Sequence, residues 1–179
     1  SAHRMTYTEV ARLLETRPTS EDERRYGPFL DDFRTMGELA AALRSRREAR
    51  GAIDFDLPDA DIVLDDAGFV VGIVPESRNV AHRLIEEFML AANEAVAKKL
   101  LFDKQPAIYR VHDRPDPDRL VDLREVLESF GYELKGDLEE VPPSAFQRLL
   151  AEIEGKPEER LLHDLLLRAQ RKAVYSEEC

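Results

Sequence analysis

Hydrophobic residues recur along the chain at two spacings, and each spacing predicts a different kind of element. The clearest helical pattern runs from His82 to Leu100, where apolar residues return every three or four positions and form a broad stripe. His82, Glu86, Met89 and Asn93 share a second face of this helix, and Met89 and Leu90 lie off the apolar stripe, so we expect neither side to be fully exposed to water. Glu86 is then a carboxylate between apolar surfaces, which needs an ion pair, a cap or a binding role, because an unpaired buried charge is costly. The stripe consists of Ala81, Leu84, Ile85, Phe88, Ala92, Ala95, Val96 and Leu100.

Other segments have shorter helical patterns, and several carry start and stop signals. Asp116 suits an N-cap, Pro117 and Pro28 suit first turns, and Gly131 suits a helix end. The segment from Arg17 to Glu23 is rich in proline, hydroxyl and charged residues, which predicts a linker. The predicted helices are Thr6–Glu15, Pro28–Arg50, Pro117–Phe130, Pro143–Leu150 and Glu158–Val174.

Strand patterns occupy the centre of the chain. Ile53, Phe55 and Leu57 alternate with aspartates, which is typical of a half-buried strand. Residues 62–64 and 69–74 predict two more strands, joined by a hairpin turn at residues 65–68. A further strand is expected at residues 107–112. Together the patterns predict an α+β fold in which short antiparallel strands pack against several α-helices, within the single domain that 179 residues indicate.

Composition narrows the class of protein. The formal net charge of −11 makes the chain, taken whole, a poor partner for nucleic acid or an anionic membrane, although arginine clusters occur at residues 44–50 and 168–172. The single cysteine, Cys179, excludes an intrachain disulfide and a thiolate zinc cluster. No segment has the length of a membrane span or the core of a signal peptide, so we expect a cytoplasmic protein with no membrane partner.

Short catalytic motifs do not identify an enzyme class for this chain. The chain has no phosphate-binding glycine loop, no GxSxG and no HExxH. His82 and Glu86 could share a metal ion but lack a third ligand. Asp54 and Asp56 could bind a cation, but the solvent side of an edge strand explains them better. Phe55 fits either core packing or stacking on a base, and Tyr7 is similarly ambiguous.

Five longer segments, in the same order along the chain, resemble the middle of the catalytic (RNB) domain of the ribonuclease II and ribonuclease R family. The ribonuclease R branch is the closer one, judging by AIDFD and YRVHD. The matching segments are MTYTEV at 5–10, RGAIDFDLP at 50–58, RNVAHRLIEEFMLAANEAVA at 78–97, IYRVHDRPDP at 108–117 and LLLRAQRKAVYS at 165–176.

The resemblance implies an enzyme that degrades single-stranded RNA processively from the 3′ end and releases nucleoside 5′-monophosphates with a divalent metal, usually magnesium. It implies that Phe55 stacks on the terminal base and that Tyr7 and Glu86 contact the terminal ribose. A carboxylate that accepts a hydrogen bond from a 2′-hydroxyl distinguishes RNA from DNA. His112 also matches the family pattern, which implies that it either lines the substrate channel or belongs to the scaffold around it.

The resemblance also implies that essential parts lie outside residues 1–179. The family's metal-binding aspartates match no segment here and precede it, and its catalytic arginine follows it. We therefore expect a central fragment that forms one wall of the active-site channel, holds no catalytic residue or metal ligand, is inactive alone and can self-associate through exposed apolar seams. Two alternatives stay open: a non-catalytic RNB-like RNA-binding or assembly module, and a helical metal-binding protein that uses His82 and Glu86.

Overall fold

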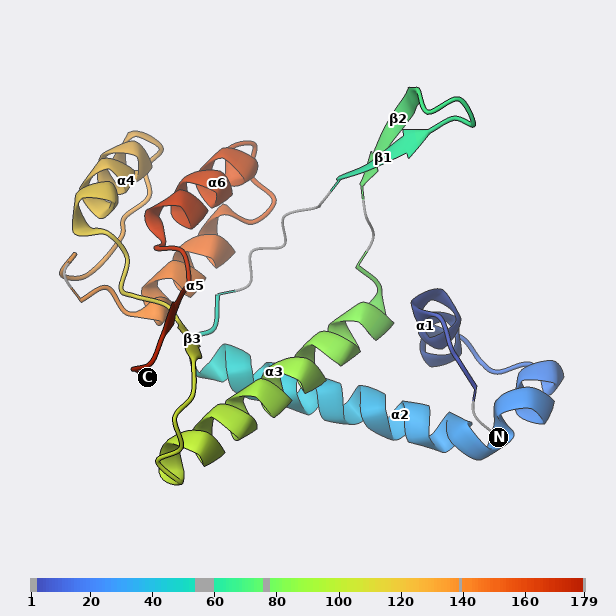
Figure 1. Cartoon of the computed structure of the whole chain (residues 1–179). Coiled ribbons are helices and arrows are strands. Elements are labelled where there is room, and N and C mark those ends of the chain that lie inside the picture. The colour runs from blue at the N-terminus through green and yellow to red at the C-terminus, as the bar shows by residue number, and fades with distance from the viewer. Residues whose placement is uncertain (1–2, 54–59, 76–77, 139, 179) are drawn as a thin grey trace. The chain divides into compact units, whose positions relative to one another are not determined.

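The computed structural model describes residues 3–53, 60–75, 78–138 and 140–178. The chain divides into two compact units, which we call unit 1 (residues 1–45 and 56–94) and unit 2 (residues 46–55 and 95–179). Within the described residues there are six helices and two antiparallel two-stranded sheets, which confirms the predicted α+β class (Figure 1). The elements are α1 (Tyr7–Glu15), α2 (Ser20–Ala49), β1 (Ala60–Leu64), β2 (Val70–Pro75), α3 (Val80–Phe102), β3 (Tyr109–Val111), α4 (Pro117–Ser129), α5 (Pro143–Ile153), α6 (Glu159–Ala169) and β4 (Val174–Ser176).

The start of α2 contradicts the sequence prediction. A linker was expected to reach Glu23 and the helix to begin at Pro28, but α2 begins at Ser20 and Pro28 lies inside it. Thr19 explains the earlier start. Its Oγ1 accepts a hydrogen bond from the Asp22 backbone N–H at 3.2 Å, while the Asp22 carboxylate accepts one from the Thr19 N–H at 2.8 Å. This reciprocal pair is a capping box, and it satisfies two backbone donors at the beginning of the helix.

The hairpin of unit 1 has the predicted turn. The Asp65 carboxylate accepts hydrogen bonds from the backbone N–H groups of Ala67 and Phe69, and Gly68 takes a φ of +85° that other residues rarely adopt. β1 and β2 pair from Ala60↔Pro75 to Leu64↔Val70, with an irregularity at Val63/Leu64. The strand expected at residues 53–57 falls almost entirely on residues outside the described part of the chain.

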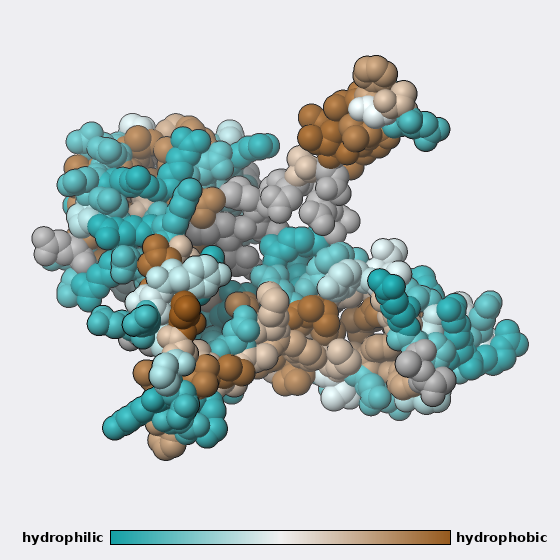
Figure 2. All heavy atoms as spheres, viewed as in Figure 1, coloured by the Kyte–Doolittle hydropathy of each residue, from teal (hydrophilic) through white to brown (hydrophobic). Residues whose placement is uncertain are grey.

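Apolar side chains remain exposed on this hairpin. Phe69 is 70% exposed and Ile73 69%, and the hairpin forms the brown surface at the upper right of Figure 2. An isolated two-stranded hairpin is only marginally stable in water, so an exposed apolar surface of this kind is suited to contact with other polypeptide.

Helix α3 matches the predicted helix, but its burial differs from the prediction. Ala81 and Leu84 are buried, whereas Ile85 and Val96, which belong to the predicted stripe, are 43% and 57% exposed. Glu86 was expected between two apolar surfaces, but its side chain is 36% exposed. The buried carboxylate is its neighbour Glu87, which is 5% exposed because it continues the face of Ala81 and Leu84.

Unit 2 has a hydrophobic core formed by α4, α5 and α6, which lie together in Figure 1. Asp116 caps α4 and Pro117 opens it, as predicted. Gly51, just after α2, has a φ of +96°, and a β-carbon there would lie 3.2 Å from Pro143 Cβ at the start of α5. The fully buried core side chains are Leu120, Leu127, Phe146, Leu149, Ile153, Leu162 and Leu166.

The last helix is shorter than predicted. It was expected to reach Val174, but α6 ends at Ala169 and Val174–Ser176 form β4. β4 pairs with β3 through Tyr109↔Ser176, Arg110↔Tyr175 and Val111↔Val174. β-Branched and aromatic residues favour strands, and here a partner strand is available for them.

Candidate functional site

A pocket in unit 1 lies between the start of α1, the middle of α2 and the first turns of α3. Its volume is about 620 Å³. Tyr7, one of the predicted site residues, lines this pocket and is 47% exposed, so its phenol ring is accessible from solvent. Most of the other lining side chains are apolar, which is typical of pockets that bind small molecules. They include Val10, Phe33, Met36, Leu84 and Ile85.

The ring of Tyr7 stacks on the imidazole of His82. The ring centroids are 4.1 Å apart and the planes are inclined by 21°. His82 is itself held by Asn79, whose Oδ1 lies 2.8 Å from His82 Nδ1. The same Oδ1 accepts hydrogen bonds from the backbone N–H groups of Ala81 and His82 and so caps α3. The N-terminus of α3 therefore fixes the ring against which Tyr7 packs.

Glu86 lies one helical turn after His82 on the same face of α3. Its carboxylate pairs with the guanidinium of Arg78, which precedes the helix. The pair is partly exposed, with side-chain exposures of 34% for Arg78 and 36% for Glu86, so the carboxylate keeps access to solvent. A carboxylate has lone pairs for more than one donor, and Glu86 can accept a further hydrogen bond while Arg78 orients it.

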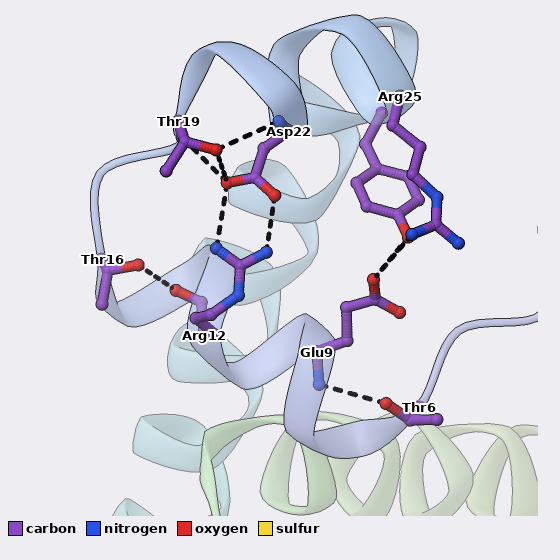
Figure 3. Close-up of polar contacts among 8 residues, drawn as sticks. Thr6, Glu9, Arg12, Thr16, Thr19, Asp22 and Arg25 are labelled. Carbon is purple, nitrogen blue, oxygen red and sulfur yellow. Dashed lines mark hydrogen bonds and ion pairs between the residues drawn. The ribbon is translucent and has the colours of Figure 1, made fainter.

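Two polar contacts hold α1 on α2 (Figure 3). Arg12 donates two hydrogen bonds to Asp22, at 2.6 and 2.9 Å, in the paired geometry that suits a guanidinium and a carboxylate. These bonds, followed by those from Thr19, hold the pKa of Asp22 well below its usual range. Tyr26 donates a hydrogen bond to Glu9, and this bond, together with burial, raises the pKa of the Tyr26 phenol. The short helix α1, whose first residue is Tyr7, is thereby anchored to α2 in its first and last turns.

The structure brings two of the four predicted site residues into unit 1. Tyr7 contacts the first turn of α3 through His82, and Glu86 belongs to α3 itself. Phe55 lies outside the described residues. His112 belongs to unit 2, where it is exposed and lines a groove with Arg110 and Arg171.

The described residues do not fit a metal site. Among them, no group of three or more His, Cys, Asp or Glu side chains is placed to hold a metal ion. His82 and Glu86, considered as a ligand pair, make other contacts instead, to Asn79 and Arg78 respectively. In the part of the chain that the structure describes, no helix combines the length and the apolar character needed to cross a bilayer.

Sequence comparison identifies the family to which these residues belong. The family model described as the RNB domain matches residues 1–179. The chain belongs to the RNB domain family. This RNB chain is 40% identical over 176 residues to ribonuclease R of Aquifex aeolicus and 40% identical over 179 residues to ribonuclease R of Thermotoga maritima. In both cases the match covers 98% of the chain and 24% of the relative, so the chain spans about a quarter of the length of these relatives.

A solved structure agrees with the sequence comparison. The RNase R of Mycoplasma genitalium in complex with ribose-methylated single-stranded RNA superimposes with a TM-score of 0.87 at 29% identity. The match covers 96% of the RNB chain and 26% of that protein. The resemblance inferred from the five sequence segments is therefore confirmed at the level of family and fold.

Sequence reasoning did not find the roles of Asn79 and Arg78. A helix-capping signal was available, because asparagine precedes the first residue of α3. The orientation of His82 by that cap, and its contact with Tyr7, could not be deduced, because α1 and α3 are far apart in the sequence.

Proposed function

We propose that the full-length protein containing this RNB chain is a processive 3′-to-5′ exoribonuclease that hydrolyses single-stranded RNA to nucleoside 5′-monophosphates. In this proposal residues 1–179 are the central part of the catalytic domain and form one wall of the channel that holds the 3′-terminal nucleotide. The family membership and the ribonuclease R relatives support this over a non-catalytic binding or assembly module.

The observation that carries the proposal is the arrangement at the start of α3. Tyr7 stacks on His82, and Glu86 follows His82 by one turn on the same face. The phenol lines the apolar pocket, and the carboxylate lies on the face of α3 that carries the ring on which Tyr7 stacks. A terminal ribose has hydroxyl donors for such a carboxylate, and DNA lacks the 2′-hydroxyl. Tyr7 and Glu86 would therefore bind and orient the terminal sugar and favour RNA.

Two further parts of the proposal rest on the resemblance. Phe55 would stack on the terminal base, and His112 would line the path of the substrate. A divalent metal, magnesium, would be held by aspartates that precede this chain in the full-length protein and would supply activated water for phosphodiester hydrolysis. The residues of this chain would bind and orient the nucleotide rather than hold the metal.

The test compares RNA with DNA of the same sequence in the full-length protein. Wild-type protein should shorten the RNA from its 3′ end and act much more slowly on the DNA. A hydrogen bond to a charged group contributes about 1.5–3 kcal/mol, so Glu86→Ala should reduce the RNA-over-DNA ratio of kcat/KM by about 10- to 150-fold. Tyr7→Phe should reduce it in the same direction.

Asn93→Ala is the matched control, because Asn93 is exposed on the same helix two turns after Glu86. Its ratio should equal that of the wild type. A full-length protein that leaves RNA intact would contradict the enzymatic proposal. Active variants that keep the wild-type ratio would contradict the assigned roles of Tyr7 and Glu86.

A further inference from the structure

Unit 2 contains a basic groove of about 1080 Å³, lined by residues from β3, the start of α4, the end of α6 and the segment that leads into β4. Five cationic side chains and two carboxylates line it, which leaves an excess of three positive charges in a chain whose net charge is −11. The exposed imidazole of His112 lines the same groove. The cationic residues are Arg110, Arg119, Arg168, Arg171 and Lys172, and the carboxylates are Asp113 and Asp116.

Both carboxylates are already engaged in other contacts. Asp116 Oδ1 accepts a hydrogen bond from the Asp118 backbone N–H at 3.2 Å, as the N-cap of α4. Asp113 lies 3.7 Å from the Arg171 guanidinium, and both side chains are about half exposed or more. Exposed pairs of this kind contribute little free energy, so a phosphate can replace Asp113 as the partner of Arg171 at small cost.

The helix dipoles explain the positions of only some of the cationic residues in the groove. Arg168 occupies the last turn of α6, where the helix dipole favours a cation. Arg119 lies in the first turn of α4, where the dipole disfavours one. Its Nη1 donates a hydrogen bond to the Arg168 backbone oxygen at 2.9 Å, which ties the start of α4 to the end of α6. Since a guanidinium carries five N–H donors, this bond leaves capacity for an anion.

The backbone that carries the groove residues is held by the core and by strand pairing. α4 and α6 both contribute to the buried core of unit 2, and the segment carrying Lys172 leads into β4, which is paired with β3. Cationic side chains whose backbones are fixed lose less conformational entropy when they bind a ligand. A guanidinium can donate two parallel hydrogen bonds to the oxygens of one phosphate, and this contact does not depend on the base sequence.

We propose that this groove binds the phosphodiester backbone of single-stranded RNA and does so without regard to the sugar. The inference rests on the proposed function and extends it, because it divides recognition between the two units. Tyr7 and Glu86 in unit 1 would read the terminal ribose, while the groove in unit 2 would hold phosphates and keep the strand bound. Phosphate contacts position a strand and carry no information on sugar or base by themselves.

The test measures equilibrium binding of a fluorescent oligoadenylate RNA, and of the matching DNA, to the full-length protein in EDTA, which prevents hydrolysis. Affinity is followed between about 50 and 200 mM salt, where each phosphate contact to a single strand contributes about −0.7 to the slope of log K against log salt. A triple variant, Arg168→Gln, Arg171→Gln and Lys172→Gln, should flatten the slope by about 2 for RNA and DNA alike. Each single substitution should flatten it by about 0.7.

The control is a second triple variant of unit 2 with the same change in charge, Arg148→Gln, Lys156→Gln and Arg160→Gln. These three residues are exposed and do not line the groove. The control should keep the wild-type slope, and the groove variants should keep the wild-type ratio of RNA to DNA affinity.

The outcomes separate the two proposals. A groove variant with an unchanged salt slope, or one that weakens RNA but not DNA, overturns the phosphate site and leaves the enzymatic proposal intact. Equal flattening in the control variant also overturns it, because the effect then comes from total charge rather than from the groove. A wild-type protein that binds the RNA but does not shorten it when metal is supplied overturns the proposed function and leaves the phosphate site standing.

Discussion

The stack of Tyr7 on His82 makes a quantitative prediction about substrate choice. An aromatic pair contributes about 0.5–1.5 kcal/mol beyond the area that it buries. Tyr7 is 47% exposed, so we take the lower part of this range, about 0.5–1 kcal/mol. That energy corresponds to about a 2- to 5-fold change in an equilibrium or rate ratio. His82→Ala should therefore lower the RNA-over-DNA ratio of kcat/KM about 2- to 5-fold, because Tyr7 is no longer held by its stack on α3.

A double-mutant cycle separates positioning from a direct contact with the substrate. Tyr7→Ala and His82→Ala should together cost less than the sum of their separate effects, since either change alone removes the stack. His82→Phe keeps an aromatic partner and loses only the contact of Nδ1 with Asn79, which lies at 2.8 Å, so it should restore most of the ratio. Kinetics of wild type, the two single variants and the double variant, each full-length and on matched RNA and DNA oligonucleotides, supply the four ratios of kcat/KM that the cycle needs. Strict additivity of the two alanine changes, in variants that remain folded, would refute the reasoning.

Three further predictions concern stability, each measured by unfolding of this chain. Asp22→Asn should lower the melting temperature at pH 7. The difference from wild type should shrink as the pH falls below the unfolded pKa of about 3.9, because the pKa of Asp22 is lowered in the folded state and protonation removes the stabilisation. A difference in melting temperature that does not depend on pH would contradict the role of Asp22. Leu162→Ala should cost about 2–5 kcal/mol in urea unfolding, whereas Leu161→Ala, at a side chain that is 50% exposed, should stay within about 0.5 kcal/mol. Gly51→Ala should destabilise because of its φ of +96°, and Gly27→Ala, in an open position of α2, should be neutral or stabilising by up to about 1 kcal/mol.

The sequence offers Tyr7 and Glu86 as candidate site residues because they lie in long, ordered matches to a family. Helical periodicity predicts the helix that carries Glu86, and turn chemistry predicts the hairpin that precedes it. The prediction that Glu86 is buried was wrong. Periodicity placed it between two apolar surfaces, but a helix with two apolar sides has no single buried face, and packing placed Glu87 inside instead.

The sequence by itself determined the features that depend on neighbours within about four residues. These include the Asp116 cap, the turn at residues 65–68 and the helical periodicity of α3. Tertiary structure decided the features that need a distant partner. Arg12 meets Asp22 at the point where α2 begins, Tyr175 becomes a strand residue because β3 is there to pair with it, and Tyr7 finds the ring of His82. The physical reason is that hydrogen bonds within a turn are closed by the local chain alone, whereas a stack, a strand pair or a basic groove exists only after packing has brought remote segments together.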